Sequence, residues 1–327
     1  MSNQISQCTQ YSYGINQTVY LTMLPNELIL LIAEKFSQKR DLNSLLRCNR
    51  RLHGLLNQQL YQLDARSRNN DAMWRAVDTA DVDLAKRAIA AGSDPNKRCE
   101  AGIWARYHPL FVAVVQARNT SKMKLIPKDE LPGFLERNDS LIRYLVSQGA
   151  DVNHSDNYQE SPLWKAVSMG EITSVRLFLD NGADVSMQDC QGSGLAHLVV
   201  RPAQSSGQNA LIYLEILNLL LEHGLDPNTS DRSNYTPLHE QMNAVSAKIF
   251  RTSRTKYRTL SEERVEDVLK LLLKYGADID ARSRFGETPL SMALEFLQDE
   301  PVCFKLLLHY GADTSLFLRL WAGSQKK

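Results

Sequence analysis

The 327-residue sequence lacks the features of a membrane, metal-binding or disulfide-bonded protein. Its five cysteines, at positions 8, 48, 99, 190 and 303, form no C-x-x-C pair, which argues against zinc and against a disulfide framework and favours a reducing compartment. The longest apolar run, residues 28–33, is far shorter than the roughly 20 residues that span a bilayer. A formal net charge of +1 gives no electrostatic case for nucleic acid or an anionic membrane.

Targeting and catalytic motifs are also missing. The first 26 residues contain no lysine or arginine and no apolar segment of signal-peptide length, so we expect a cytoplasmic or nuclear protein that is not secreted. His239 and Glu240 begin the zinc motif H-E-x-x-H, but Asn243 stands where the second histidine would be. There is no G-x-S-x-G motif and no phosphate-binding loop. We therefore predict no metal, no cofactor and no enzymatic activity.

What the sequence does contain is a pattern that restarts. An opening of the form Thr-Pro-Leu-x-x-Ala is followed by Leu-Leu-x-x-Gly-Ala-Asp, and then the cycle begins again. In four cases the next opening lies thirteen residues after the closing glycine, and from the first glycine it lies seventeen residues on. A constant connector is typical of a stacked array, because neighbouring units dock there. The closing glycines are Gly92, Gly149, Gly182, Gly224, Gly276 and Gly311.

The period and the motif resemble those of ankyrin repeats, whose unit is about 33 residues with a T-P-L-H-x-A start. The resemblance implies an all-α solenoid of about six repeats that binds other proteins. We place the repeats at residues 70–97, 98–154, 155–187, 188–229, 230–281 and 282–316, with a tail at 317–327. The third repeat is the most regular: Ser161 is the expected N-cap, Pro162 fits the first turn, and Gly182 ends the second helix. In the fourth, Gly194 and Leu195 replace Thr-Pro, so its first helix loses both cap and proline.

Two positions after each opening lies the column where the family usually has histidine. The resemblance implies that His197 and His239 tie one connector to the next by hydrogen bonds. Trp74 and Trp164 occupy the same column, and we expect inward packing, with aromatic anchoring of a partner as the alternative. The column contains Trp74, Phe111, Trp164, His197, His239 and Ser291.

Three repeats carry extra residues between their two helices, at 116–138, 201–210 and 243–263. Insertions in such arrays collect as loops on one face, often a functional one. The third insertion is basic, with two aromatic residues interleaved. A solvated loop is the preferred interpretation, and a site for nucleic acid or an acidic partner is the alternative. Its residues of interest are Lys248, Phe250, Arg251, Arg254, Lys256, Tyr257 and Arg258.

Ahead of the array, residues 22–62 predict three short amphipathic helices, and residues 1–21 are expected to be disordered or loosely packed. The first helix starts at Pro25, and its apolar positions are Leu28, Leu31, Ile32 and Phe36. Asp41 is placed to cap the second helix, and the third should end at Tyr61.

These residues resemble an F-box, whose pattern is Leu-Pro-x-Glu-Leu, an apolar helix, Asp-Leu and a basic third segment that here contains Arg47, Arg50 and Arg51. The Trp that often follows the basic pair is replaced by Leu52 and His53. The resemblance, to F-box/ankyrin-repeat proteins of the fungal type, implies a substrate-recognition subunit of an SCF-type ubiquitin ligase. Its partners would be the SCF adaptor, the cullin and an unknown protein target. The implied adaptor-binding residues are Leu24, Pro25, Glu27, Leu28, Ile32, Phe36, Asp41, Leu42, Leu45 and Leu46.

One alternative to the F-box stays open for this module. It could be a helical cap that seals the first repeat, since arrays need end caps. The protein would then be a plain ankyrin scaffold that joins proteins without ubiquitin ligation.

The tips of the connectors are the predicted target-binding residues, because Tyr, Trp and Arg are enriched in binding hot spots. The alternative is that tip aromatics stabilise the turns. The tip residues are Trp104, Arg106, Tyr107, Tyr158, Tyr235, Arg284 and Phe285.

Overall fold

The computed structural model describes residues 10–11, 19–67, 70–100, 105–123, 130–200, 210–243, 262–295 and 301–315. It divides into two compact units, Met1–Ala150 and Asp151–Lys327. Helices dominate both units, as predicted. The two strands in the described part of the chain are β1 (Gln10–Tyr11) and β2 (Val19–Tyr20), which pair antiparallel within the segment predicted to be disordered or loosely packed.

The first unit begins with a short 3-10 turn (Leu21–Met23) and three helices, α2 (Asn26–Ala33), α3 (Lys39–Cys48) and α4 (Arg50–Arg66). Asn49 starts α4, because its side chain accepts the N–H of Arg51 at 2.7 Å. The helix then continues to Arg66, past Tyr61 where the sequence predicts its end. The three helices share a small apolar core of Ile29, Ala33, Leu42, Leu46, Leu52 and Leu56.

Two helix pairs complete the first unit: α5 (Asp71–Thr79) with α6 (Val82–Ala90), and α7 (Pro109–Met123) with α8 (Leu131–Ser147). Helix α4 packs against both α5 and α6. The N-terminal helices therefore belong to the same compact unit as the first two repeats.

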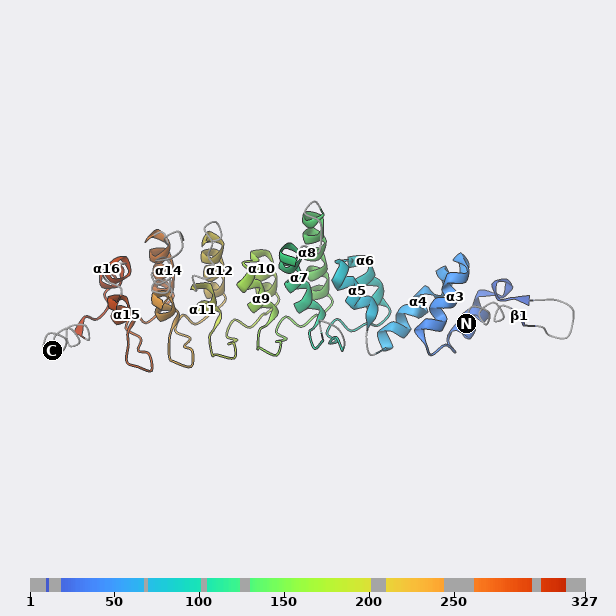
Figure 1. Ribbon diagram of the computed structural model, residues 1–327, viewed down its shortest axis with the longest axis horizontal. Coiled ribbons are helices and arrows are strands. Elements are labelled where there is room, and N and C mark those ends of the chain that lie inside the picture. Colours follow the sequence, from blue (N-terminus) through green and yellow to red (C-terminus); the bar gives the residue numbers. More distant parts are fainter. Residues whose placement is uncertain are drawn as a thin grey trace. The chain divides into compact units, whose positions relative to one another are not determined.

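The second unit stacks further helix pairs. Each first helix contacts a second helix, as in α9 (Pro162–Met169) with α10 (Ile172–Asp180), α11 (Leu195–Val200) with α12 (Ala210–Glu222), and α15 (Pro289–Glu295) with α16 (Pro301–His309). In the fifth repeat, residues 237–243 are helical and precede α14 (Glu262–Lys274). Second helices of successive repeats also touch, so the unit has two layers. The connectors of this unit leave the pairs on one side (Figure 1).

The ends of these helices follow local rules that the sequence contains. Ser161 Oγ accepts the N–H of Trp164 at 3.1 Å, and Pro162 occupies the first turn of α9, which confirms the predicted start of this helix. Gly182 ends the third repeat with φ of 78°, and the other five closing glycines have φ between 81° and 97°. A side chain in this left-handed region is strained, so the glycine column is a backbone requirement.

The structure differs from the sequence prediction in the second repeat, at the insertion of residues 116–138. It was predicted to be a loop, but α7 runs on to Met123 and α8 starts at Leu131, so most of it extends the two helices. Burial explains the difference. Phe134 is 3% exposed, and Asn138, at 1%, donates its Nδ2 to the carbonyl of Ala113 at 2.8 Å. Residues 124–129, 201–209 and 244–261, with the basic stretch, lie outside the described residues, as does the tail at 317–327.

Trp74 and Trp164 pack inward, with 7% and 3% of their surface exposed, which confirms the structural interpretation of these positions. In the described segments no helix is both long enough and apolar enough to cross a bilayer.

Candidate protein-binding surfaces

The N-terminal helices expose an apolar face along α2. Leu28 is 46% exposed, Leu31 55% and Ile32 39%, and Met23 just before the helix is 70% exposed. The opposite side of α2 buries Ile29 and Ala33 in the core of the three helices. Both sides of α2 are thus apolar, and the stripe of Leu28, Leu31 and Ile32 is the side that faces outward. We call Met23, Leu28, Leu31 and Ile32 the α2 face.

The predicted adaptor-binding residues separate into two groups. Leu42 and Leu46 lie in the core at 0% and 3% exposure, and Leu24, Phe36 and Leu45 pack against it partly buried. These residues hold the helices together. The exposed members of the predicted set are Pro25, Glu27, Leu28, Ile32 and Asp41.

The start of α2 is held in place by α4. Arg51 donates from Nη2 to the carbonyl of Leu24 at 2.9 Å and to Oδ1 of Asn26 at 2.7 Å. The α2 face is therefore presented on an anchored helix.

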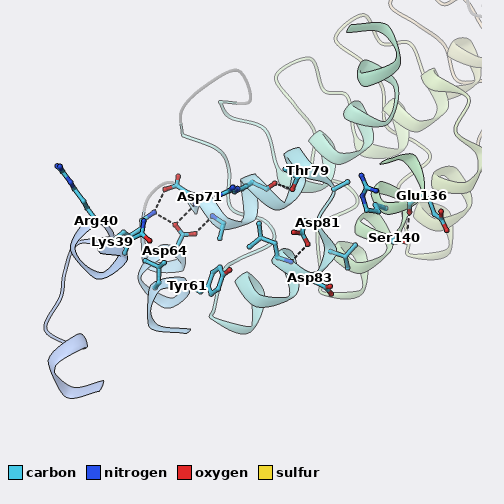
Figure 2. Close-up of a pocket in the computed structure, with 18 residues that line it drawn as sticks. Lys39, Arg40, Tyr61, Asp64, Asp71, Thr79, Asp81, Asp83, Glu136 and Ser140 are labelled. Carbon is cyan, nitrogen blue, oxygen red and sulfur yellow. Dashed lines mark hydrogen bonds and ion pairs between the residues drawn. The ribbon is translucent and has the colours of Figure 1, made fainter. Parts of the chain in front are cut away.

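A polar cluster joins these helices to the first repeat. Asp64, 5% exposed in the last turn of α4, accepts the backbone N–H groups of Asp71 at 3.2 Å and Ala72 at 2.7 Å. Lys39 of α3 donates to Asp64 Oδ1 at 2.5 Å and to Asp71 Oδ2 at 2.8 Å. Figure 2 shows the side chain of Lys39 reaching both Asp64 and Asp71. Asp64 thus caps α5 from another helix, which satisfies N–H groups that a helix start leaves unpaired.

The charge state of Lys39 reflects the same contacts. Burial lowers the pKa of Lys39, but the hydrogen bonds to Asp64 and Asp71 outweigh it and leave the pKa raised above its ordinary value. On the other side of α4, Lys97 donates to the carbonyls of Ser67 at 2.5 Å and Ala65 at 3.5 Å, and so caps the helix end. Two lysines therefore fasten the N-terminal helices to the repeats.

This cluster borders a groove of about 1170 Å³ lined by residues of α3, α4, α5, α6 and α8, all within the first unit (Figure 2). Its exposed charged residues are mixed: Arg40, Arg75 and Arg137 are accompanied by Asp83 and Glu136. A groove with both signs of charge selects no particular class of ligand.

The connector tips of the second unit are fixed by acidic side chains. Asp156 Oδ1 accepts the N–H groups of Tyr158 at 2.8 Å and Glu160 at 3.0 Å, and Asp189 and Asp231 make the corresponding pairs in the next two repeats. In the sixth repeat Ser283 Oγ accepts the N–H groups of residues 285 and 287, each at 3.2 Å. These bonds hold the outermost residues of each tip in place.

The predicted tip residues differ in exposure. Tyr158 and Phe285 are 62% and 73% exposed, and Arg106 and Arg284 are also exposed. Tyr107 instead stacks on Phe111 with ring centroids 5.2 Å apart, so it supports its connector. Tyr235 donates its hydroxyl to Glu287 Oε2 at 2.9 Å and links two tips. Trp104 lies outside the described residues.

The histidine column links neighbouring repeats, as predicted. His239 accepts the N–H of Thr236 at Nδ1 (3.1 Å) and donates from Nε2 to the carbonyl of Glu287 (3.1 Å). His197 accepts the N–H of Gly194 and donates to the carbonyl of Tyr235 at 2.8 Å. Burial lowers the pKa of His239, which disfavours the protonated ring.

A second set of equivalent positions, here called the asparagine column, was not predicted from the sequence. Four residues after three of the six closing glycines stands an asparagine whose side-chain amide donates to the carbonyl of the closing glycine of the next repeat. Asn96 Nδ2 donates to Gly149 O at 2.9 Å, and Asn153 and Asn228 make the same bond to Gly182 and Gly276 at 3.1 and 2.9 Å. The constant spacing from the glycine was the available signal. Ser186 occupies this column in the third repeat and bonds to Asp184 of its own turn at 2.7 Å.

Two segments of the chain match family models. Residues 134–189 match a model described as ankyrin repeats (3 copies), and residues 259–313 match one described as ankyrin repeats (many copies). The chain therefore contains ankyrin repeats in these two segments. Arrays of stacked repeats present extended binding surfaces. The three N-terminal helices lie outside both matched segments.

Curated relatives and a solved structure also contain ankyrin repeats. The chain is 31% identical over 157 residues to mouse ankyrin repeat and SOCS box protein 16, covering 46% of this chain and 30% of that protein. It is 28% identical over 257 residues to the human protein of that name, covering 77% of this chain and 47% of the relative. The chain thus spans less than half the length of these relatives. An ankyrin repeat domain from Acinetobacter baumannii AYE matches the fold with a TM-score of 0.54 at 23% identity, over 74% of this chain and 98% of that domain.

Proposed function

We propose that this ankyrin-repeat protein is a substrate-recognition subunit of an SCF-type ubiquitin ligase. Its N-terminal helices would dock on the SCF adaptor, and through it on the cullin, while the array holds a target protein. The chain itself would contribute no catalytic residue, because in such ligases the conjugating enzyme and the RING subunit supply the chemistry. The resemblance of residues 22–61 to an F-box is the starting point.

The α2 face is the observation that carries the proposal. Leu28, Leu31 and Ile32 are each more than one-third exposed on a helix that Arg51 anchors. Full burial of one such side chain contributes about 1.5–3 kcal/mol. A contiguous apolar face that folding leaves open is typical of an interaction site.

The relatives supply a precedent for the modular arrangement. By name, the mouse and human proteins combine ankyrin repeats with a SOCS box. An array of these repeats is thus joined to a second module in related chains. In this chain the second module would be the F-box-like helices.

The test is co-purification of the full-length chain with the SCF adaptor and cullin. Leu31→Glu and Leu28→Glu place charge on the α2 face without touching the core, and we expect both to abolish recovery of the adaptor. Leu211→Glu is the matched control, because Leu211 is an exposed leucine (76%) on α12 of the second unit. Unchanged recovery of the adaptor with both α2 variants would refute docking through this face.

Two other variants, although simpler to choose, would give results that cannot be assigned to docking alone. Leu24→Ala removes a side chain that packs against the module core, so it would report stability as well as docking. Deletion of residues 1–62 would also cut α4, whose Asp64 caps α5. Point substitutions on the α2 face avoid both effects.

The second candidate is a non-enzymatic ankyrin scaffold in which the N-terminal helices only cap the array. The bonds of Asp64 to the start of α5 and of Lys97 to the end of α4 favour a capping role. This hypothesis predicts that Leu31→Glu leaves all partner binding intact, because the cap uses α4 and not the α2 face.

A further inference from the structure

The connector tips of the fourth, fifth and sixth repeats are joined into one surface. The backbone N–H of Arg232 donates to the carbonyl of Gln191 at 3.3 Å, and the N–H of Arg284 donates to the carbonyl of Ser233 at 2.8 Å. The two bonds join equivalent positions of successive tips. We call residues 190–192, 232–234 and 284–286 the tip ridge. A surface fixed before binding loses less conformational entropy when a partner arrives.

The charges on the tip ridge are arranged by sign. Asp189 and Asp231 lie half-buried at the base, where each carboxylate accepts two backbone N–H groups of its own turn. Arg232 and Arg284 are exposed at equivalent positions of the next two tips. The outermost charged groups on the ridge are therefore the guanidinium groups, which suit bidentate bonds to carboxylates.

An apolar anchor lies beside the second arginine. Phe285 is 73% exposed, although its backbone N–H is fixed by Ser283 Oγ at 3.2 Å and the following Gly286 has φ of 78°. Folding thus holds a large aromatic ring out in solvent next to Arg284. Arginine and aromatic side chains together are typical of binding hot spots.

We propose that the tip ridge binds an acidic peptide segment that also carries a bulky apolar side chain. Carboxylates of the segment pair with Arg232 and Arg284, and the apolar side chain packs on Phe285. This inference rests on the proposed function, in which the array holds a target protein, and it names the chemical class of the recognised segment.

The experiment starts with short random peptides displayed on phage and selected on the full-length chain. Enriched peptides are synthesised with a fluorophore, and their affinity is measured by fluorescence anisotropy. We expect enrichment of Asp or Glu together with Phe, Leu or Trp, and binding that weakens as salt rises. Arg232→Glu with Arg284→Glu should weaken binding about tenfold or more, and Phe285→Ser about tenfold.

The matched control is Arg87→Glu with Lys305→Glu, which makes the same change of net charge at exposed sites on α6 and α16 and should keep wild-type affinity. No enriched peptide, enrichment of neutral or basic peptides, or equal affinity of the ridge variant and the control would overturn the inference. A single-stranded oligonucleotide that binds more tightly than the selected peptides, through the same arginines, would also overturn it.

The two proposals fail separately. The Arg232 and Arg284 variants leave the α2 face intact, so adaptor recovery with them tests docking on its own. Loss of peptide binding in a chain that still recovers the adaptor affects only the ridge, and a chain that binds peptides but never the adaptor affects only the ligase proposal.

Discussion

Replacement of Asp64 by Ala should destabilise the first unit more than replacement of any other carboxylate of the N-terminal helices. Asp64 is 5% exposed and makes three interactions at once: with the N–H groups of Asp71 and Ala72 and with the ammonium group of Lys39. The alanine variant leaves both N–H groups at the start of α5 without this acceptor. It also removes one of the contacts that join α3 and α4 to the first repeat.

The magnitude follows from these contacts. Loss of an N-cap lowers the free energy of unfolding by about 0.5–2 kcal/mol, and a hydrogen bond to a charged group contributes about 1.5–3 kcal/mol. Lys39 keeps its pair with the more exposed Asp71, and a surface pair of that kind contributes only about 0–1 kcal/mol. We therefore expect D64A to lower the stability of the first unit by about 3 kcal/mol, or ~6–12 °C in Tm.

The assay is urea and thermal denaturation of the full-length chain, followed by circular dichroism and by limited proteolysis near α5. D71N is the matched control, because it removes a carboxylate from the same cluster but keeps the cap, and it should change stability by less than about 1 kcal/mol. D64N should fall between the two. If D64A unfolds with the same midpoint as D71N, the capping of α5 by Asp64 contributes nothing and the argument is wrong.

The remaining predictions concern single hydrogen bonds in the array. Ser186→Asn should restore the missing bond to Gly224 and raise the free energy of unfolding by about 0.5–1.5 kcal/mol, and an unchanged urea midpoint would contradict this. Burial lowers the pKa of His239, so below its ordinary value of 6.5 the unfolded chain binds a proton that the folded chain does not. Stability should therefore fall as the pH drops below about 6.5, and H239Q should flatten that dependence in urea titrations. Asn138→Ala should lower the free energy of unfolding by about 1–3 kcal/mol in urea denaturation, whereas an unchanged value would show that the buried hydrogen bond of its side chain is dispensable.

The repeats could be predicted because their signals are local. Gly182 needs a left-handed backbone, Ser161 caps the helix that follows it, and His239 bonds to a residue at a fixed place in the next connector. Each of these depends on a constant spacing, and a constant spacing is visible in a single sequence. The asparagine column also lies at a constant distance from the closing glycine, so a single sequence contains the signal for it as well.

The junction between the N-terminal helices and the first repeat could not be predicted in this way. Lys39 and Asp64 are 25 residues apart in sequence, and no period relates them. The second-repeat insertion was expected to be a loop because extra residues in such arrays collect as loops, and buried contacts such as the bond of Asn138 to Ala113, which extend the helices, are not visible in the repeat pattern. The outward direction of Leu31 was equally hidden, since α2 is apolar on both sides and periodicity cannot choose between them.

The cap and the docking module appear as rivals in the sequence, but the contacts assign them to different faces. Capping uses Asp64 and the end of α4, which Lys97 also holds. Docking would use Leu28 and Leu31 on α2, which turn away from the module core. A chain that fastens the module to its first repeat also limits how far an adaptor on the α2 face can move relative to that repeat. The two functions therefore support each other: a rigid cap would let the first unit carry the adaptor as one body, which a flexible linker between residues 62 and 70 would not.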